Sequence, residues 1–441
     1  MYKRQVLIHW RSTPYREKWV LCRQGTAAQP IVVSGVPGPS GQLPVIDGRD
    51  ATTRLALDYW NESRGVLKIG GANIPSDTLP SHIVIENLDI RSGRPPYSFT
   101  NADNDLEAYS SNAAAIYVEK AEHLVIRNCV LSDSGNGLFI GSFNGQTRDI
   151  LIDGNSIHGN GIEGSAYEHN TYTSAIGITY QRNHMGRLRE NCDGNNLKDR
   201  SAGLVVRYNW IEDGNRQLDL VDAADGSAVA THPDYRTTFV YGNLLLEADL
   251  EGNSQIIHYG GDSGASGGYR KGTLHFFHNT LVSTRSSNTT LVRLSTDDEH
   301  ADVRDNILYT TATGSHLAML NTAGVLDLRD NWLRQDWVVS HSGGGTVIDH
   351  GSNVTGTDPG FADFAGRDFA PAQGSACVDR GGPLHADTLP DHQPVRQYVR
   401  HQQTIVRPDD GVLDLGALES GAVFADDFET GNPDACSHVG P

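Results

Sequence analysis

A short motif that ends in Asn recurs along most of this chain, and its spacing limits what the chain can fold into. The motif returns at Asn87, Asn128, Asn155, Asn183, Asn209, Asn243, Asn279, Asn306 and Asn331. Where the series is uninterrupted, from Asn128 to Asn209, the step is about 25 to 28 residues, within the range of solenoid repeats. Each repeat is therefore expected to form one coil.

The residues around each Asn indicate which kind of solenoid this is. The segments alternate apolar and polar residues, favour Val, Ile, Phe and Tyr, and are too short for helices, so they predict strands. An Asn tolerates a tight left-handed bend, and its amide can hydrogen-bond the matching Asn of the next coil. No stretch shows the three- and four-residue apolar spacing of helical repeats. We therefore predict an all-β chain, a right-handed parallel β-helix solenoid with an asparagine ladder and loop insertions.

Composition and charge exclude several classes of partner. The formal net charge of the 441 residues is −19, and no basic arm or stripe is present, so the chain is not expected to bind nucleic acid. No apolar run is long enough to cross a membrane. The start of the chain also lacks the apolar core of a signal peptide. We expect a monomer with no membrane span and no signal peptide in this chain.

The repeat divides the chain into four parts. Residues 1–80 lack the period and are expected to form an entry region that caps the N-terminal end, because the end of a solenoid exposes core and strand edges. Regular coils are expected over 81–335, C-terminal coils and a closing segment over 336–420, and a tail over 421–441. Residues 423–431 of this tail resemble the short C-terminal tails of proteins that Gram-negative bacteria export. That resemblance implies a secreted or periplasmic bacterial protein.

Longer excursions interrupt the coils at 91–115, 158–175, 184–196, 223–236 and 260–271. Insertions in a solenoid emerge as loops, often on the face that binds a ligand. We expect these loops to form the walls of a groove.

Cationic residues gather in two neighbouring repeats of this acidic chain, at Lys198, Arg200, Arg207 and Arg216. A concentrated positive site on a negative protein favours an anionic ligand that is held by specific contacts rather than by the overall field. A uronic-acid polysaccharide, an acidic glycan, fits this requirement best.

The register of the coils supplies a second argument. Residues at equivalent positions of parallel coils stack about 4.8 Å apart. The strands of successive repeats insert polar residues at Lys198, Asp219, His258 and Arg293, which we expect to form one column. His169 and Tyr172, from the preceding excursion, are expected near one end of this column.

The bond to be cut determines which groups are needed. Elimination across the C4–O4 bond of a uronate requires a partner for the carboxylate, a base for the C5 proton and an acid for the leaving oxygen. A Lys beside Arg residues can be the base, so Lys198 is assigned that role, with Arg200 or Arg216 on the carboxylate. The acid is expected to be Tyr259 or His258, or else Tyr172 or His169. The remaining polar groups, Arg207, Asp219 and Arg293, are expected to bind the substrate.

The ladder, the Lys198-Asp199-Arg200 strand and the Arg207-Tyr208-Asn209 that follows resemble the pectate-lyase-like right-handed β-helix superfamily, over about residues 30 to 420. They resemble its alginate lyase and chondroitinase B branch more loosely. That resemblance implies Lys198 as the base and Arg216 as its partner. It also implies calcium held by acidic side chains against the substrate carboxylate.

Two features depart from the pattern of that branch. Its Arg-His-Gly segment is replaced by Arg216-Gln217-Leu218-Asp219, and no clear pair of acidic ligands precedes Lys198. If calcium binds, the first candidates for its ligands are Glu190, Asp193, Asp219 and Asp222, because hard cations require several oxygens.

Three other functions are compatible with the same residues. A β-helix glycoside hydrolase would need two carboxylates about 5 to 9.5 Å apart, supplied by Asp219 with Asp222 or by Asp199 with Asp219. A uronate C5-epimerase would share the proton abstraction of a lyase. A non-catalytic glycan-binding surface protein would need only the ladder and the loops.

Overall fold

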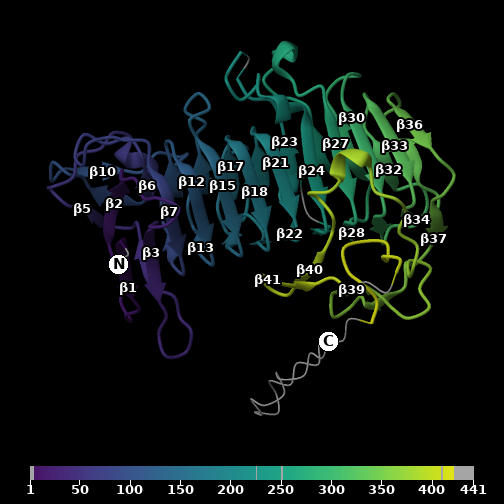
Figure 1. Cartoon of the computed structure of the whole chain (residues 1–441), viewed down its shortest axis with the longest axis horizontal. Helices are drawn as coiled ribbons and strands as arrows, with labels where there is room; N and C mark the ends of the chain where they lie inside the picture. Colours follow the sequence, from purple (N-terminus) through teal and green to yellow (C-terminus); the bar gives the residue numbers. More distant parts are fainter. Residues whose placement is uncertain (1–3, 225, 250–251, 409–410, 422–441) are drawn as a thin grey trace.

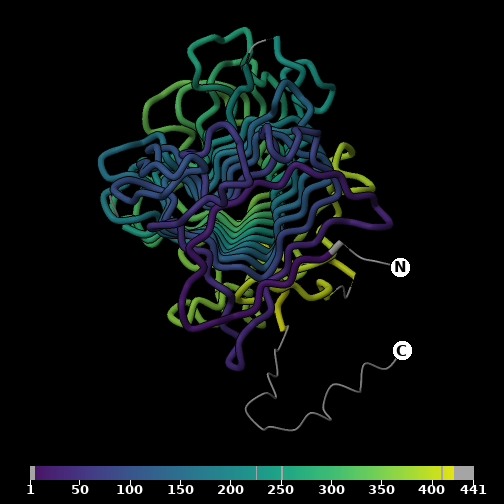
Figure 2. Tube along the Cα trace, turned by 90° about the vertical axis from the view of Figure 1, so that its left-hand side faces the viewer, coloured from purple at the N-terminus to yellow at the C-terminus, as the bar shows by residue number. Residues whose placement is uncertain are grey.

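Strands of successive coils pair side by side and wind into a right-handed parallel β-helix, as the sequence predicted (Figure 1). The computed structural model of the chain describes residues 4–224, 226–249, 252–408 and 411–421. Seen from one end, the coils lie one behind another around a common core (Figure 2). The predicted export-like tail at 423–431 lies outside the described residues.

A 12-stranded parallel sheet forms one side of the helix, with its strands adjacent in chain order. Its strands are β1 (Arg4–His9), β3 (Ile31–Val36), β7 (Ser81–Glu86), β12 (Glu122–Arg127), β15 (Arg148–Asp153), β18 (Ile176–Gln181), β21 (Ala202–Arg207), β24 (Thr237–Tyr241), β27 (Thr273–Phe277), β30 (His300–Arg304), β33 (Val325–Arg329) and β36 (Thr346–Asp349).

An 11-stranded parallel sheet receives the chain from the 12-stranded sheet after the sharp turn that holds the ladder. Its strands are β4 (Val45–Asp47), β8 (Asp89–Arg91), β13 (Val130–Ser132), β16 (Ser156–His158), β19 (His184–Met185), β22 (Trp210–Glu212), β25 (Leu244–Glu247), β28 (Thr280–Ser283), β31 (Ile307–Thr310), β34 (Trp332–Arg334) and β37 (Val354–Gly356).

A 14-stranded sheet completes each coil and carries the residues of the predicted column. Its strands are β2 (Glu17–Leu21), β5 (Ala51–Thr53), β6 (Gly65–Ile69), β9 (Ser98–Thr100), β10 (Leu106–Ala108), β11 (Ala114–Val118), β14 (Asn136–Ile140), β17 (Thr171–Thr173), β20 (Leu197–Asp199), β23 (Leu218–Leu220), β26 (Gln255–Tyr259), β29 (Thr289–Leu294), β32 (Leu317–Leu320) and β35 (Val338–Ser340).

Helical structure in the described ranges is limited to four short 3-10 turns, η1 (Glu62–Arg64), η2 (Pro233–Arg236), η3 (Ser266–Gly268) and η4 (Ala386–Thr388). None of the described segments is a helix long and apolar enough to cross a membrane. Strands from the predicted entry region already belong to the sheets, because β3 pairs with β7 and β4 pairs with β8 in parallel register. The coils therefore begin within residues 1–80.

Buried side-chain amides join the coils at one corner of the helix. Each amide Nδ2 donates to Oδ1 of the next Asn at 2.9–3.2 Å, as at Asn155, Asn183 and Asn209. The same Oδ1 also accepts the backbone N–H of the preceding Asn. The ladder comprises Asn155, Asn183, Asn209, Asn243, Asn279, Asn306, Asn331 and also Asn353, which the sequence series did not include.

Two Asn of the predicted series, Asn87 and Asn128, are not ladder members. They adopt φ of 58° and 52° and occupy the left-handed position that precedes the ladder position. In the coil that contains Asn128, the ladder position is Cys129, whose backbone N–H donates to Asn155 Oδ1 at 3.0 Å. The bend and the amide stack are therefore made by adjacent residues rather than by one Asn.

The C-terminal part of the described chain turns back along the outside of the helix (Figure 1). It contains the antiparallel hairpins β38 (Phe361–Asp363) with β39 (Asp368–Pro371) and β40 (Arg396–Val399) with β41 (Gln403–Val406). Phe369 and Tyr398 pack on Trp210, on the outer face of the 11-stranded sheet. Apolar residues on this outer face are therefore buried as well as those of the interior.

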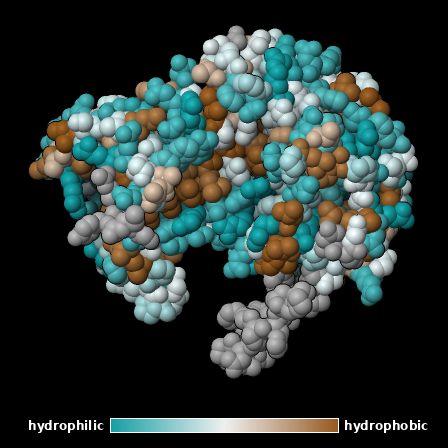
Figure 3. Space-filling view, viewed as in Figure 1, coloured by the Kyte–Doolittle hydropathy of each residue, from teal (hydrophilic) through white to brown (hydrophobic). Residues whose placement is uncertain are grey.

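An uncovered row of apolar residues crosses the outer face of the 12-stranded sheet (Figure 3). Val84, Val125, Leu151 and Val205 point outward and are half-buried, in register from coil to coil through Thr179. This face differs from the outer face of the 14-stranded sheet, where charged residues replace the apolar row.

The ladder predicts an asymmetric response to two Asn substitutions. Asn209→Ala removes the amide that bonds Asn243 Oδ1 and the Tyr180 carbonyl and leaves buried partners unsatisfied, so it should destabilise the fold by about 3 kcal/mol. Asn87→Gly keeps a residue suited to positive φ and should change stability by less than about 0.5 kcal/mol. Thermal unfolding of both variants tests this, and equal losses would contradict the assignment.

Candidate functional site

The predicted column exists in the strand register of the 14-stranded sheet. Tyr172 pairs with Lys198, Lys198 with Asp219, Asp219 with His258, and His258 with Arg293. The register that the sequence predicted is therefore confirmed. The roles of these residues are a separate question.

Strand alternation places these side chains on the outer face of the sheet. Their neighbours Leu197, Leu218 and Ile257 are fully buried in the core. The connections from the 11-stranded sheet lie on one side of the column, and the connections to the 12-stranded sheet, including 223–236 and 260–271, lie on the other. The predicted loop walls thus flank the column.

Two residues assigned to the site lie on the opposite face. Tyr259 is 0% exposed within the hydrophobic core, so the prediction that it acts as an acid is wrong. Asp199 is also 0% exposed, where it bonds Thr173, Ser201 and Arg270, and burial raises its pKa. Because adjacent strand residues face opposite sides, neither can meet a ligand beside Lys198 or His258.

Asp219 is the centre of the column. One carboxylate oxygen, Oδ2, accepts from Lys198 Nζ and from Asn195 Nδ2, and the other, Oδ1, lies 2.8 Å from His258 Nδ1. Only 3% of its side chain is exposed. Asp219 was predicted to bind substrate, but with both oxygens engaged it instead positions an ammonium and an imidazole side by side.

Burial and hydrogen bonding set the charge of this pair. Burial alone would raise the pKa of Asp219, but the bonds from His258 and Lys198 hold that pKa well below its usual range. Burial lowers the pKa of His258, although the hydrogen bond to Asp219 acts in the other direction. Asp219 is therefore ionised at neutral pH and His258 is neutral. With Nδ1–H on Asp219, the lone pair of His258 is on Nε2, which faces the Ser295 hydroxyl at 2.9 Å.

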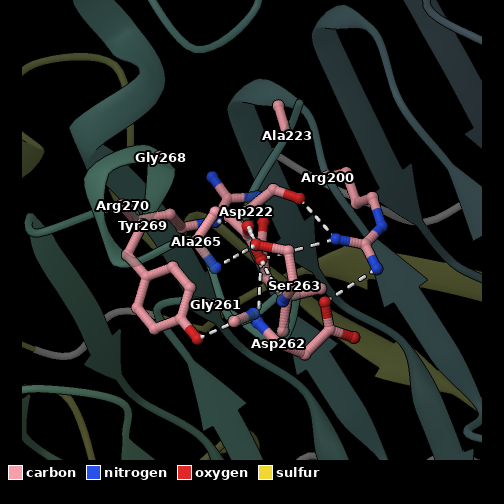
Figure 4. Close-up of polar contacts among 12 residues, drawn as sticks. Arg200, Asp222, Ala223, Gly261, Asp262, Ser263, Ala265, Gly268, Tyr269 and Arg270 are labelled. Atoms are coloured by element: carbon pink, nitrogen blue, oxygen red, sulfur yellow. Dashed lines mark hydrogen bonds and ion pairs between the residues drawn. The ribbon is translucent and has the colours of Figure 1, made fainter. Parts of the chain in front are cut away.

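A glycine-rich loop beside the column supplies a carboxylate that the sequence did not identify, Asp262, which lies next to Arg200 (Figure 4). Asp262 Oδ2 contacts Lys198 Nζ at 2.6 Å, and Oδ1 contacts Arg200 Nη2 at 2.8 Å. Asp222 holds the loop, since its Oδ1 accepts the Asp262 backbone N–H at 2.8 Å and its Oδ2 accepts the Ser263 hydroxyl. Lys198 and Arg200 therefore each bind one oxygen of the Asp262 carboxylate.

Arg200 joins the loop to the aromatic end of the column. Its Nε donates to the Tyr172 hydroxyl at 3.0 Å, and its Nη1 donates to the Asp222 carbonyl at 2.5 Å. Beyond Tyr172 the column continues in Phe139 and Tyr117, whose rings stack 5.0 Å apart. The outer face thus presents aromatic rings next to the ionic residues.

His258 also contacts a serine, in an arrangement similar to that of serine hydrolases. Nε2 lies 2.9 Å from Ser295 Oγ, with Asp219 on the other nitrogen. Acyl transfer additionally needs free N–H groups for the oxyanion. The N–H groups of Ser295, Thr296 and Gly261 already donate to Tyr259, Glu299 and Ser295 Oγ. We therefore infer that Ser295 orients the imidazole of His258 and is not a nucleophile.

Arg216 and Arg293 place two further positive charges near His258. Arg216 donates to Gln255 at 3.0 Å and Arg293 is exposed, and in the part of the chain that the structure describes neither forms an ion pair. Burial lowers the pKa of Arg216, and the charge of Arg293 adds to this effect. Arg207 lies elsewhere, on the 12-stranded sheet, where it bonds Gln181 and Tyr241, so it does not belong to the column.

His169 lies beside the column, but its side chain hydrogen-bonds to the backbone. It is buried, its Nδ1 accepts the Asn195 N–H at 2.9 Å, and its ring packs edge-on against Tyr172. Burial and the nearby charge of Lys198 lower the pKa of His169 to about 3. A neutral, enclosed imidazole of this kind positions Asn195 rather than donating protons at neutral pH.

The four predicted calcium ligands are not gathered into one site. Asp219 and Asp222 are bound to the cations and the loop described above, and Glu190 and Asp193 lie in the loop before β20. Among the described residues, none of the four belongs to a group of three metal-ligating side chains with donor atoms within 4.8 Å. Calcium binding stays a prediction.

Comparison with known proteins gives matches in solved structures alone. No family model and no curated protein matches the chain. The tailspike protein of E. coli bacteriophage HK620 in complex with a pentasaccharide is 11% identical over 78% of this chain and 61% of its own, with a TM-score of 0.44. The GH136 lacto-N-biosidase from Eubacterium ramulus is 13% identical over 80% and 62%, with a TM-score of 0.41. The chain spans about three fifths of the length of these structures.

The low pKa of His169 predicts a specific pH dependence of stability. In the unfolded chain His169 takes up a proton below about pH 6.5, whereas the folded chain stays neutral there down to about pH 3, so stability is lost as the pH falls through this window. His169→Gln should cost about 1 kcal/mol at pH 7 and less at pH 4.5. Urea unfolding at pH 7 and pH 4.5 measures the difference in unfolding free energy between the unmodified chain and His169→Gln. A difference that is larger at pH 4.5 than at pH 7 would contradict this explanation.

Proposed function

We propose that this protein is a polysaccharide lyase that cleaves an acidic, uronic-acid-containing glycan by β-elimination. The observation that carries the proposal is the Asp262 carboxylate between Lys198 and Arg200. It comes from an exposed glycine-rich loop, and 31% of its side chain is accessible. A uronate carboxylate can take the same two contacts when this loop moves aside, because it offers the same pair of oxygens.

The neighbouring groups supply the two proton transfers that elimination needs. Asp219 holds Lys198 Nζ on one oxygen and His258 Nδ1 on the other, so a proton donor and an imidazole lie on either side of one carboxylate. The imidazole can accept a proton at Nε2 when the Ser295 hydroxyl turns away from it. An ammonium that contacts two carboxylates is better suited to donate a proton to the leaving oxygen than to accept one. We therefore assign the C5 proton to His258 and the O4 proton to Lys198, which exchanges the roles expected from the sequence.

The remaining cations support the same assignment. Arg200 braces the substrate carboxylate, while Arg216 and Arg293 lie next to His258 and suit a second uronate of the chain. Positive charge beside the developing enolate stabilises the transition state of proton abstraction. The rings of Tyr172 and Phe139 can pack against neighbouring sugars.

A hydrolase is the second candidate, since Asp219 and Asp262 contact the same ammonium and their facing oxygens lie within about 5 Å of each other. A hydrolase needs one carboxyl group that stays protonated until it reaches the leaving oxygen. Burial would raise the pKa of Asp262, but the charge of Lys198 outweighs burial and lowers this pKa. The pKa of Asp219 is also lowered. Neither carboxylate is therefore suited to be the acid, and elimination is favoured.

Incubation with a panel of uronate polysaccharides separates these reactions. A lyase produces unsaturated uronate ends that absorb ultraviolet light, a hydrolase produces saturated reducing ends alone, and an epimerase exchanges the C5 proton with solvent without cleavage. Parallel reactions with a chelator test the calcium prediction. Saturated products alone would overturn the proposal.

The proposed proton transfers predict large losses in two variants. Lys198→Ala and His258→Ala should each lower kcat/KM by about 100-fold or more, as expected when a group that transfers a proton is removed. Lys120→Ala is a matched control, because Lys120 is also a buried lysine paired with a carboxylate, Asp77, but lies outside the column. A comparable loss in the control, or full activity in His258→Ala, would contradict the assignment.

Removing the loop carboxylate should have the opposite effect on binding. Asp262→Ala abolishes the competitor for Lys198 and Arg200, so acidic oligosaccharides should bind about tenfold tighter in calorimetric titrations. Asp298→Ala, which removes an exposed carboxylate paired with Lys271, is the control and should leave affinity unchanged. Weaker binding in Asp262→Ala would show that this carboxylate does not occupy the ligand position.

A further inference from the structure

A second cluster of ionisable residues lies on the 12-stranded sheet, away from the column. His275 projects from β27, and the C-terminal segment places His385 and Asp387 opposite it at the start of η4. The rings of His275 and His385 lie 4.7 Å apart. Residues about 110 positions apart in the sequence thus converge on one point.

His275 is the unusual member of this cluster. Its side chain is 0% exposed, yet neither ring nitrogen has a partner at normal hydrogen-bond distance. The nearest carboxylate oxygens, of Asp302 and Asp387, each lie 3.6 Å away, one on each side of the ring. Buried polar groups without partners are rare, and one that points at further ligand-type side chains indicates a missing ligand.

The carboxylate behind His275 suits a metal-binding histidine. Asp302 is held by Arg304, whose Nη2 contacts Oδ1 at 2.6 Å and whose Nε contacts Oδ2 at 2.9 Å. It faces His275 Nδ1. Metal-bound histidines usually turn their second nitrogen toward a carboxylate, which fixes the tautomer and leaves the other nitrogen free to coordinate. Here that other nitrogen, Nε2, faces Asp387.

The distances among the three donor atoms match a small tetrahedral site. Asp387 Oδ2 lies 3.6 Å from His275 Nε2 and 3.7 Å from His385 Nδ1. The ligand atoms of all three residues lie within 4.8 Å of one another. Ligands bound to zinc at about 2.0–2.2 Å stand roughly 3.4 Å apart in a tetrahedron, so small side-chain movements are sufficient.

We propose that His275, His385 and Asp387 bind Zn²⁺, through His275 Nε2, His385 Nδ1 and Asp387 Oδ2, with water in the fourth position. When the ion binds, His385 Nδ1 exchanges the Asp387 backbone N–H that it accepts at 3.1 Å for the metal. Two imidazoles and one carboxylate favour zinc over calcium or magnesium, which prefer oxygen ligands. His385 and Asp387 are partly exposed, so the ion can enter from solvent. The zinc joins the C-terminal segment to the sheet, and it is independent of the proposed reaction.

The chain contains a matched control for this site. At η2, His232 and Asp234 repeat the arrangement of His385 and Asp387: each His accepts the backbone N–H of the Asp two residues later, and each Nδ1 lies 3.7 Å from its Oδ2. Neither of these residues belongs to a described group of three metal ligands. Zinc binding at η2 is therefore not expected.

The test uses the full chain, stripped with a chelator, dialysed and titrated with Zn²⁺. We expect about one tightly bound zinc per chain by mass spectrometry after desalting, with a rise in Tm. His385→Asn and Asp387→Asn should weaken zinc binding by about 100-fold and abolish the rise in Tm, while His232→Asn should behave as the unmodified chain. Because the first two residues are partly exposed, these variants should fold.

Two results would overturn the proposal. One is that the unmodified chain retains no zinc. The other is that His385→Asn and Asp387→Asn retain zinc like the unmodified chain, which would locate binding at another group such as Glu122, His123 and Asp149. His275→Gln, with circular dichroism to verify its fold, provides an independent third variant.

Discussion

Buried amides that hydrogen-bond from coil to coil are the constraint on which the rest of the molecule depends. From Asn183 onward, each ladder Asn accepts the backbone N–H and the side-chain amide of the Asn in the preceding coil, so neighbouring coils cannot slide past each other without leaving buried groups unpaired. A slip of one residue would also exchange the core and surface faces of every strand. The fixed register is what aligns Tyr172, Lys198, Asp219, His258 and Arg293 on one outer face.

The sequence predicted the solenoid and the column because both follow from local spacing. The repeat period and the polar residues within apolar strands were sufficient to predict which residues pair between coils, and the structure shows the same pairing. Strand parity could also have excluded Tyr259 and Asp199, since each is adjacent to a residue that faces outward. The displacement of Asn87 and Asn128 by one position was likewise visible, because each follows its Ile one residue sooner than Asn155 does.

Other parts of the site depend on contacts that no local pattern contains. Asp262 lies in a glycine-rich segment whose path is set by bonds to Asp222, a residue 40 positions earlier. The C-terminal segment turns back because it packs on outward-facing apolar residues such as Trp210. When both faces of a strand are apolar, the sequence does not show which residues face the core and which face outward. His275 and His385 meet for the same reason. Long-range packing, rather than the repeat, brings these residues together.

The proposed reaction requires a uronate carboxylate to take the place of Asp262 between Lys198 and Arg200. Both cations are already paired with Asp262, so the proposed binding mode would exchange one carboxylate for another rather than bury new charge. A crystal structure of the His258→Ala variant with an acidic oligosaccharide tests this most directly. We expect a sugar carboxylate in contact with both cations and Asp262 displaced; a bound sugar with Asp262 still bridging Lys198 and Arg200 would contradict the proposed binding mode.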